Sequence, residues 1–162
     1  MENKHKKVIA HPINFSFWER SEDRTKTLYL LDVYLNDKLN LITIQLGENS
    51  ISDLTKYKSD FEQLVKYTAK KAPNANILII GDWWDFKRNE IRKETAKNNN
   101  CTFVDLSSVI GDKKYQSKAG QICHLSNGQT ITVTKEAASH PSDLGMHFIA
   151  DEIIKHLEKT TR

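Results

Sequence analysis

The chain has 162 residues, of which 38% are hydrophobic and 28% are charged, and its formal net charge is +3. This length fits one domain with a sizeable core, so we treat residues 1–162 as a single domain. The 24 basic and 21 acidic residues are interspersed, which excludes the clustered basic face of a nucleic-acid-binding protein. No apolar run approaches the roughly 18 residues that span a bilayer, and no apolar signal core follows the N-terminal lysines. We therefore expect a cytoplasmic protein without a membrane span.

Strand and helix patterns alternate along the chain. Short apolar runs predict strands, and apolar residues three and four positions apart predict helices. In chain order, the expected elements are a strand at 7–10, a helix from Ser21 to about 36–40, a strand at 41–46, a helix from Ser52 or Asp53 to Pro73, a strand at 76–80, a helix to about Asn98, a strand at 101–106, a hairpin strand at 129–133 and a helix from Ser142 to about Lys159. This alternation predicts an α/β sandwich of the doubly wound kind, with a parallel sheet covered on both faces.

The cysteines and histidines show no metal-ligand spacing. Cys101 and Cys123 are isolated and lack a CxxC pattern, so they predict neither a metal site nor a disulfide framework, and a single bridge between them is the less favoured alternative. Three of the histidines, His11, His124 and His147, are not spaced as ligands of one ion. We therefore expect no metal.

Candidate binding residues follow the apolar run at 41–46. Ligands of open α/β sheets bind just past the carboxyl ends of the strands, where Gly47, Glu48 and Asn49 lie. An amide side chain there can direct an N–H donor at a developing negative charge, and a glycine lets the backbone approach closely. The alternative is that Gly47 and Asn49 are ordinary turn residues.

A second candidate stretch, SHPSDLGMHFIA, begins at Ser139 and places a histidine directly before an amphipathic helix. A histidine with the ordinary pKa of about 6.5 can take and return a proton near neutral pH, which suits His140 to the role of general base. Taken alone, however, His140 fits a surface or capping residue better.

Two tryptophans and two aspartates follow the predicted strand at 76–80. Trp83 and Trp84 either line a substrate pocket or pack beneath a loop. Asp82 and Asp85 form either a carboxylate pair or a solvated turn, and the turn is the favoured alternative.

In their order and spacing, these motifs resemble those of the SGNH (GDSL-like) serine esterases and acylhydrolases. The third block of that family is similar to Leu46–Asn49, and its fifth block is similar to His140, Pro141, Gly145, Ile149 and Ala150. The second block of one subgroup resembles INFSFWER, which contains Asn14. Trp83, Trp84 and the Val-Asp-Leu-Ser at 104–107 also look like that subgroup. The resemblance extends from about Val8 to Leu157.

The resemblance implies a three-layer α/β/α sandwich with a flavodoxin-like sheet, and acyl transfer to a serine without a cofactor. His140 would act as general base, and Asn49 and Gly47 would form the oxyanion hole. Asn14, Trp83 and Glu48 would bind the substrate, which is expected to be a small-molecule or carbohydrate ester carrying an acyl or acetyl group.

The chain departs from the family pattern in two places. It lacks the Gly-Asp-Ser stretch of the nucleophile, so we expect the first strand of the family's sheet to be missing and the chain to be incomplete at its N-terminus, where a signal would lie. The serines nearest the site, Ser16, Ser50 and Ser52, do not lie on the turn that exposes the family's nucleophile.

The acid that orients the histidine usually lies three residues before it, where this chain has Ala137. Glu136 is one substitute, and a dyad without an acid is the other alternative. Because a chain without the serine would be nearly inert, a non-catalytic binding domain or a degenerate or truncated homologue stands as the alternative function. A nucleotide-binding flavodoxin-like domain is disfavoured, because the chain has no glycine-rich phosphate loop.

Overall fold

The computed structural model describes residues 9–49, 53–125 and 127–160. Within them, three parallel strands form a sheet in the order β1 (Leu41–Ile44), β2 (Asn76–Ile80) and β3 (Thr102–Val104). Helix α2 (Leu54–Lys71) connects β1 to β2, and α3 (Phe86–Asn98) connects β2 to β3. The predicted α/β class and parallel sheet are therefore confirmed.

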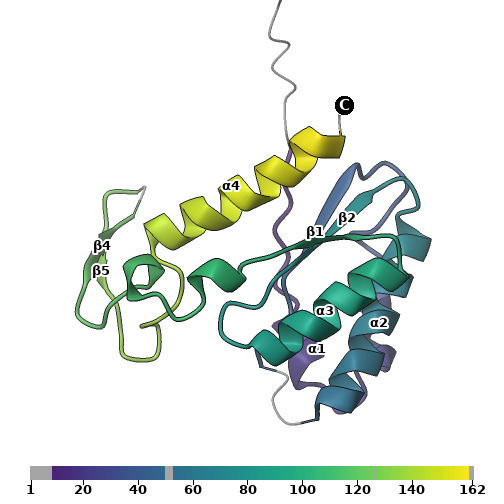
Figure 1. Cartoon of the computed structure of the whole chain (residues 1–162), viewed down its shortest axis with the longest axis horizontal. Helices are drawn as coiled ribbons and strands as arrows, with labels where there is room; N and C mark the ends of the chain where they lie inside the picture. The colour runs from purple at the N-terminus through teal and green to yellow at the C-terminus, as the bar shows by residue number, and fades with distance from the viewer. Residues whose placement is uncertain (1–8, 50–52, 126, 161–162) are drawn as a thin grey trace, which may run out of the picture.

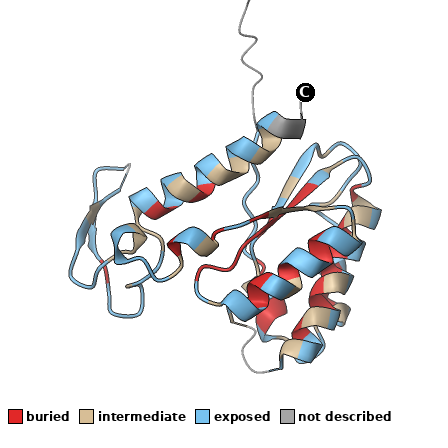
Figure 2. Ribbon diagram, in the orientation of Figure 1, coloured by how far each residue is buried: buried red, intermediate tan, exposed pale blue. Residues whose placement is uncertain are grey.

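Helices cover both faces of the sheet (Figure 1). Successive side chains of a strand point to opposite faces, and the buried residues accordingly form two clusters. The cluster on one face joins the sheet to α2 and contains Ile44, Ile77, Ile79, Tyr57, Phe61, Leu64 and Val65. The cluster on the other face joins it to α4 (Asp143–Thr160) and contains Leu78, Ile80, Val104 and Ile149. Figure 2 shows the buried residues gathered on the strands and on the inner sides of these helices.

Helices α2 and α3 bury faces of different chemistry. The apolar spacing of α2 predicts its inner face, and the side chain of Asp53 caps it by accepting the backbone N–H of Lys56. The buried face of α3 is mostly polar and includes Arg88, Asn89 and Arg92. Apolar periodicity is therefore weak in α3, although the helix is well packed.

The segment before β1 differs from the prediction of one helix from Ser21. A short helix, α1 (Ser16–Arg20), is followed by a 3-10 helix, η1 (Thr25–Leu31). Local side-chain bonds explain the difference: Asp23 accepts the backbone N–H of Lys26, and the hydroxyl of Thr27 donates to the carbonyl of Arg24. Bonds of this kind compete with regular α-helix formation.

The strands are shorter than predicted. Of the strand expected at 7–10, residues 7 and 8 lie outside the described residues, and Ile9 and Ala10 belong to no strand. The expected strand at 41–46 ends at Ile44, because the carbonyl of Leu46 accepts from the side chains of Arg92 and Tyr57 instead of a neighbouring strand. In the described part of the chain, β1 forms one edge of the sheet.

The C-terminal third contains the predicted hairpin and helix. Strands β4 (Ile122–His124) and β5 (Thr130–Thr132) pair antiparallel, after the short 3-10 helices η2 (Ser107–Val109) and η3 (Lys113–Tyr115). On the last helix, Met146 is 57% exposed, whereas Phe148 packs against the core. No helix among the described residues is long and apolar enough to cross a membrane.

Candidate functional site

A cleft of about 230 Å³ lies past the carboxyl ends of β1 and β2, beside the start of α4. This is the position at which open α/β sheets bind ligands. Its lining includes Gln45, Glu48, Trp83, Trp84, Arg92 and His140. Three predicted site residues, Glu48, Trp83 and His140, are thus brought together. Asn14 is not part of the lining; its side chain accepts the backbone N–H of Ser16 at the start of α1.

The imidazole of His140 is held from three directions. Its Nδ1 lies 3.1 Å from the carbonyl oxygen of Ala137, and its Nε2 lies 3.5 Å from Oε1 of Glu48. The ring of Trp84 meets the imidazole edge-on, with 5.0 Å between the ring centres. A neutral imidazole that donates Nδ1–H to Ala137 keeps its Nε2 lone pair on the side of Glu48 and the cleft.

The carboxylate beside His140 comes from a residue that the sequence did not single out for this role. Ala137, at the position expected for an acid, contributes its backbone carbonyl, and Glu48 contributes the carboxylate. Glu136 is exposed, and bonds with its own backbone and with Thr134 lower the pKa of its carboxyl group. Glu48, rather than Glu136, is therefore the carboxylate beside the imidazole, but it lies at Nε2, whereas the orienting position at Nδ1 is taken by the carbonyl of Ala137.

The loop that carries His140 is fixed by backbone bonds. The carbonyl of His140 accepts the N–H of Ser117 at 2.8 Å, and the N–H of Ser139 donates to the carbonyl of Ser117 at 3.0 Å. The indole N–H of Trp83 donates to the carbonyl of Ser139. Trp83 is 2% exposed, so it packs beneath the loop while also lining the cleft. Gly145 is required at the start of α4, because a Cβ there would collide with the carbonyl oxygen of Tyr115.

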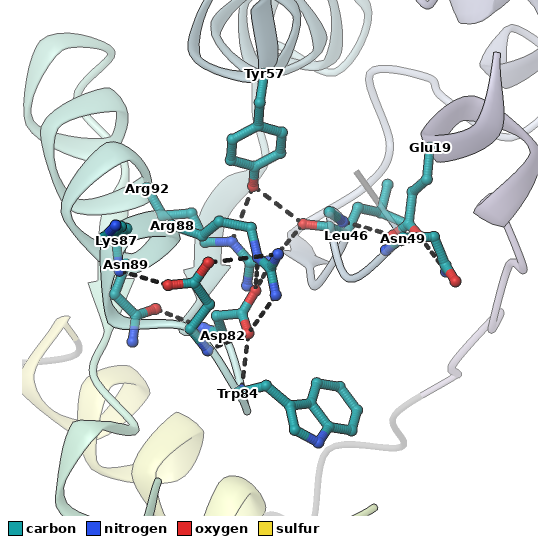
Figure 3. Close-up of polar contacts among 12 residues, drawn as sticks. Glu19, Leu46, Asn49, Tyr57, Asp82, Trp84, Lys87, Arg88, Asn89 and Arg92 are labelled. Atoms are coloured by element: carbon teal, nitrogen blue, oxygen red, sulfur yellow. Dashed lines mark hydrogen bonds and ion pairs between the residues drawn. The ribbon is translucent and has the colours of Figure 1, made fainter. Parts of the chain in front are cut away.

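The turn after β1 binds a carboxylate of the chain itself. Oε1 of Glu19 accepts the backbone N–H of Gly47, and Oε2 accepts both the backbone N–H and the side-chain amide of Asn49. Figure 3 shows Glu19 and Asn49 side by side at this turn. The oxyanion-hole role of Gly47 and Asn49 stays a prediction, but their donors are engaged by Glu19 in this structure.

Gly47 has a backbone conformation that other residues rarely adopt. Its φ is +114°, and a Cβ at this position would lie 2.5 Å from the hydroxyl of Tyr57. We expect Gly47→Ala to lower the free energy of unfolding by about 2–3 kcal/mol, through backbone strain and overlap. Gly111→Ala is the matched control: its φ is +78° but no atom lies within 4 Å of a new Cβ, so strain alone should cost about 1 kcal/mol. Urea unfolding measures the free energy of unfolding of both variants. Equal losses in Gly47→Ala and Gly111→Ala would contradict the overlap with Tyr57.

A buried cluster of charged side chains, drawn in Figure 3, contributes Asp82 and Arg92 to the lining of the cleft. The carboxylate of Asp82 accepts from Nε of Arg88 at 2.6 Å and from Nη2 of Arg92 at 3.1 Å. Arg92 also donates to the carbonyls of Leu46 and Ile80, which follow β1 and end β2. This one guanidinium therefore ties the carboxyl ends of two strands together.

The two aspartates that follow β2, Asp82 and Asp85, have different environments in the structure. The solvated-turn interpretation is wrong for Asp82, because its side chain is 1% exposed and ion-paired. Burial raises the pKa of Asp82, but the bonds and charges of Arg88 and Arg92 outweigh burial and hold it below its usual value. Asp85 is partly exposed and caps α3 by accepting the backbone N–H of Lys87. Neither carboxylate is placed as a free catalytic base.

Glu48 has the opposite shift. Burial is the largest cause that raises the pKa of its carboxyl group, and the charges of Glu19 and Asp82 add to the effect, while His140 and Arg88 oppose it. A carboxyl group whose pKa is raised inside a cleft is a feature typical of functional sites.

The described residues bring no serine to the lining of the cleft, and Ser50 and Ser52 lie outside those residues. Ser16 lies in α1 and is not part of the lining. Both cysteines are free thiols. No group of three His, Cys, Asp or Glu side chains within the described ranges is placed to hold a metal ion. The chain matches no protein-family model and no curated protein.

Proposed function

We propose that this cleft hydrolyses acyl or acetyl esters of small molecules or carbohydrates, with His140 as the general base. The observation that carries the proposal is the fixed imidazole, which is anchored through Nδ1 to Ala137 and directs Nε2 toward Glu48 and the cleft. The indole ring of Trp84 supplies an apolar wall next to this nitrogen. Ester hydrolysis needs a base near neutral pH in a partly enclosed site, and this arrangement supplies one.

In the proposed reaction, the oxygen of the nucleophile attacks the ester carbonyl carbon and its proton passes to Nε2 of His140. The bond from that carbon to the alcohol oxygen then breaks, and Nε2 returns the proton to the departing oxygen. Two nucleophiles satisfy this scheme: a water molecule, which completes hydrolysis in one cycle, or a serine as in the family that the chain resembles. With a serine, the first cycle leaves an acyl-serine, which water then attacks with His140 again as the base, releasing the acid and restoring the serine hydroxyl. Ser50 and Ser52 are the serines to test.

The tetrahedral oxyanion also needs N–H donors. Gly47 and Asn49 are the predicted donors, and Glu19 engages them. Gln45 lines the cleft, and no hydrogen bond within the described part of the chain engages its side-chain amide. We therefore include Gln45 as a further oxyanion donor.

A kinetic comparison tests this role of Gln45. Gln45→Ala should lower kcat by about 10²-fold without a matching rise in KM, because the lost bond forms only as charge develops on the oxygen. Gln63→Ala, at an exposed position of α2, is the control. A change confined to KM would assign Gln45 to substrate binding instead.

The second candidate is a non-catalytic binding domain. The observation in its favour is that the carboxylate of Glu19 already occupies the donors of Gly47 and Asn49. Such a domain would keep the cleft and bind an ester without cleaving it.

Hydrolysis of p-nitrophenyl acetate and 1-naphthyl acetate by the wild-type chain separates the two candidates. The chain contains six histidines, and free imidazole also cleaves activated esters, so the urea-unfolded chain at equal concentration is the control. Saturable hydrolysis above that control supports the esterase. A folded chain that matches its unfolded control favours the binding domain. Mass spectrometry after reaction with a phosphonate ester identifies a serine nucleophile if one is labelled.

A further inference from the structure

Glu19 is not part of the cleft lining, yet it holds the turn that carries Glu48. Its carboxylate accepts N–H groups from Gly47 and from Asn49, the two residues that flank Glu48 in the chain. Both flanking amides are thereby directed toward α1, while the side chain of Glu48 reaches His140. The direction of the backbone at Glu48 thus depends on Glu19.

Glu19 is itself held firmly. Its neighbour Trp18 is fully buried and packs edge-on against Phe61 of α2, with 6.4 Å between the ring centres. Arg24 donates two hydrogen bonds to the carbonyl of Glu19 and forms an ion pair with Asp60 at 2.9 Å. Helix α1 is therefore anchored to α2, and Glu19 is 4% exposed.

We propose that Glu19 is a positioning residue, which fixes the turn at 47–49 so that the carboxylate of Glu48 faces Nε2 of His140. Glu48 needs such support because its own side chain is 47% exposed and is otherwise free to sample several rotamers. The effect of Glu19 on the position of Glu48 is inferred from the contacts of Glu19 with Gly47 and Asn49 alone. Its effect on catalysis rests on the proposed esterase function.

The ionisation of Glu48 reports on its position. Four charged groups act on this carboxylate: Glu19 and Asp82 raise its pKa, and His140 and Arg88 lower it. Burial is the largest effect and raises the pKa above 4.5. If the turn moves, Glu48 becomes more solvated and its pKa falls back toward 4.5.

Two variants loosen the turn without changing its charge. Glu19→Asp keeps the carboxylate but is shorter by one methylene, so it cannot reach both Gly47 and Asn49. Asn49→Ala removes the amide donor and leaves the backbone N–H. Asn36→Ala is the matched control, because Asn36 is exposed and its side chain accepts only the backbone N–H of Lys38.

Carbon-13 NMR titration of the Glu48 carboxyl group is the measurement. We expect its pKa to fall toward 4.5 in both turn variants and to stay unchanged in Asn36→Ala. We also expect kcat/KM for p-nitrophenyl acetate to fall about tenfold or more in the turn variants, since small displacements of a catalytic group are costly. Circular dichroism confirms that each variant is folded, and if Glu19→Asp is not, Asn49→Ala decides.

An unchanged Glu48 titration in the folded variants would overturn the positioning role. A shifted titration in a chain without measurable esterase activity would support the positioning role and reject the proposed function. A shifted titration with unchanged kcat/KM in an active chain would overturn the catalytic consequence.

Discussion

Replacing His140 with alanine is expected to lower kcat/KM for p-nitrophenyl acetate by about 10²- to 10⁴-fold, the range typical of a lost general base. Nε2 of the imidazole faces Glu48 and the cleft, and neither Asp82 nor Arg92 is placed to replace it, because both are buried in ion pairs. The loss should fall mainly on kcat, since Trp84, which lines the cleft beside His140, remains. Steady-state kinetics at pH 7.5 measures it.

Controls are needed because other histidines contribute a background rate with activated esters. His147→Ala removes an exposed imidazole on α4 and should leave kcat/KM within about twofold of the wild-type value, because surface substitutions perturb little. Equal losses in His140→Ala and His147→Ala would mean that the measured rate arises from surface imidazoles. Activity retained in His140→Ala would contradict its role as general base.

Replacing Asp82 with asparagine is expected to lower the free energy of unfolding by about 3–5 kcal/mol, the usual cost of breaking a buried ion pair from one side. The substitution leaves Arg92, whose side chain is 2% exposed, without its carboxylate partner. It also removes the ion pair between Asp82 and Arg88. Urea unfolding at pH 7 measures the loss. Asp85→Asn is the control: its ion pair with Arg88 is longer, at 3.5 Å, the residue is partly exposed and asparagine also caps helices, so a change of less than about 1 kcal/mol is expected.

The loss of unfolding free energy in Asp82→Asn should depend on pH in a defined direction. The folded state holds the pKa of Asp82 below its ordinary value of 3.8, so the stabilisation is fully present above that value. It is lost as the pH falls through the lower, folded-state pKa. The difference between the wild type and Asp82→Asn should therefore be constant from about pH 5 to pH 7 and shrink below about pH 4. A difference that grows on acidification would contradict the ion pairs.

The sequence predicts the apolar framework well, because burial of apolar side chains leaves a periodic pattern. The run at Asn76–Ile80 forms β2 as predicted, and the spacing in α2 identifies the face that carries Phe61 and Leu64. The rule that sites lie past the carboxyl ends of parallel strands correctly places Glu48 at the cleft.

Buried polar side chains leave no periodic pattern in the sequence, and their contacts are therefore not predicted from it. The charged sequence around Arg92 gives no sign that this side chain is buried, but its guanidinium donates hydrogen bonds to backbone carbonyls at the ends of two strands. Glu19 contacts Gly47 across 28 positions of the chain, and no local signal connects them. The pairing of His140 with Glu48 has the same origin, because only the fold brings the two residues together.

The order of the strands in the sheet follows their order in the chain. Each strand therefore pairs with the next strand along the chain, and each β-α-β unit closes over a single helix, so the sheet can form without the segment that precedes β1. The contact between Glu19 and the turn at 47–49 joins two segments on opposite sides of η1. It adds little stability until the sheet holds that turn in place. We expect the scaffold to assemble early in folding and the acid–base pair to be aligned late, so substitutions at Glu19 should speed unfolding more than they slow folding.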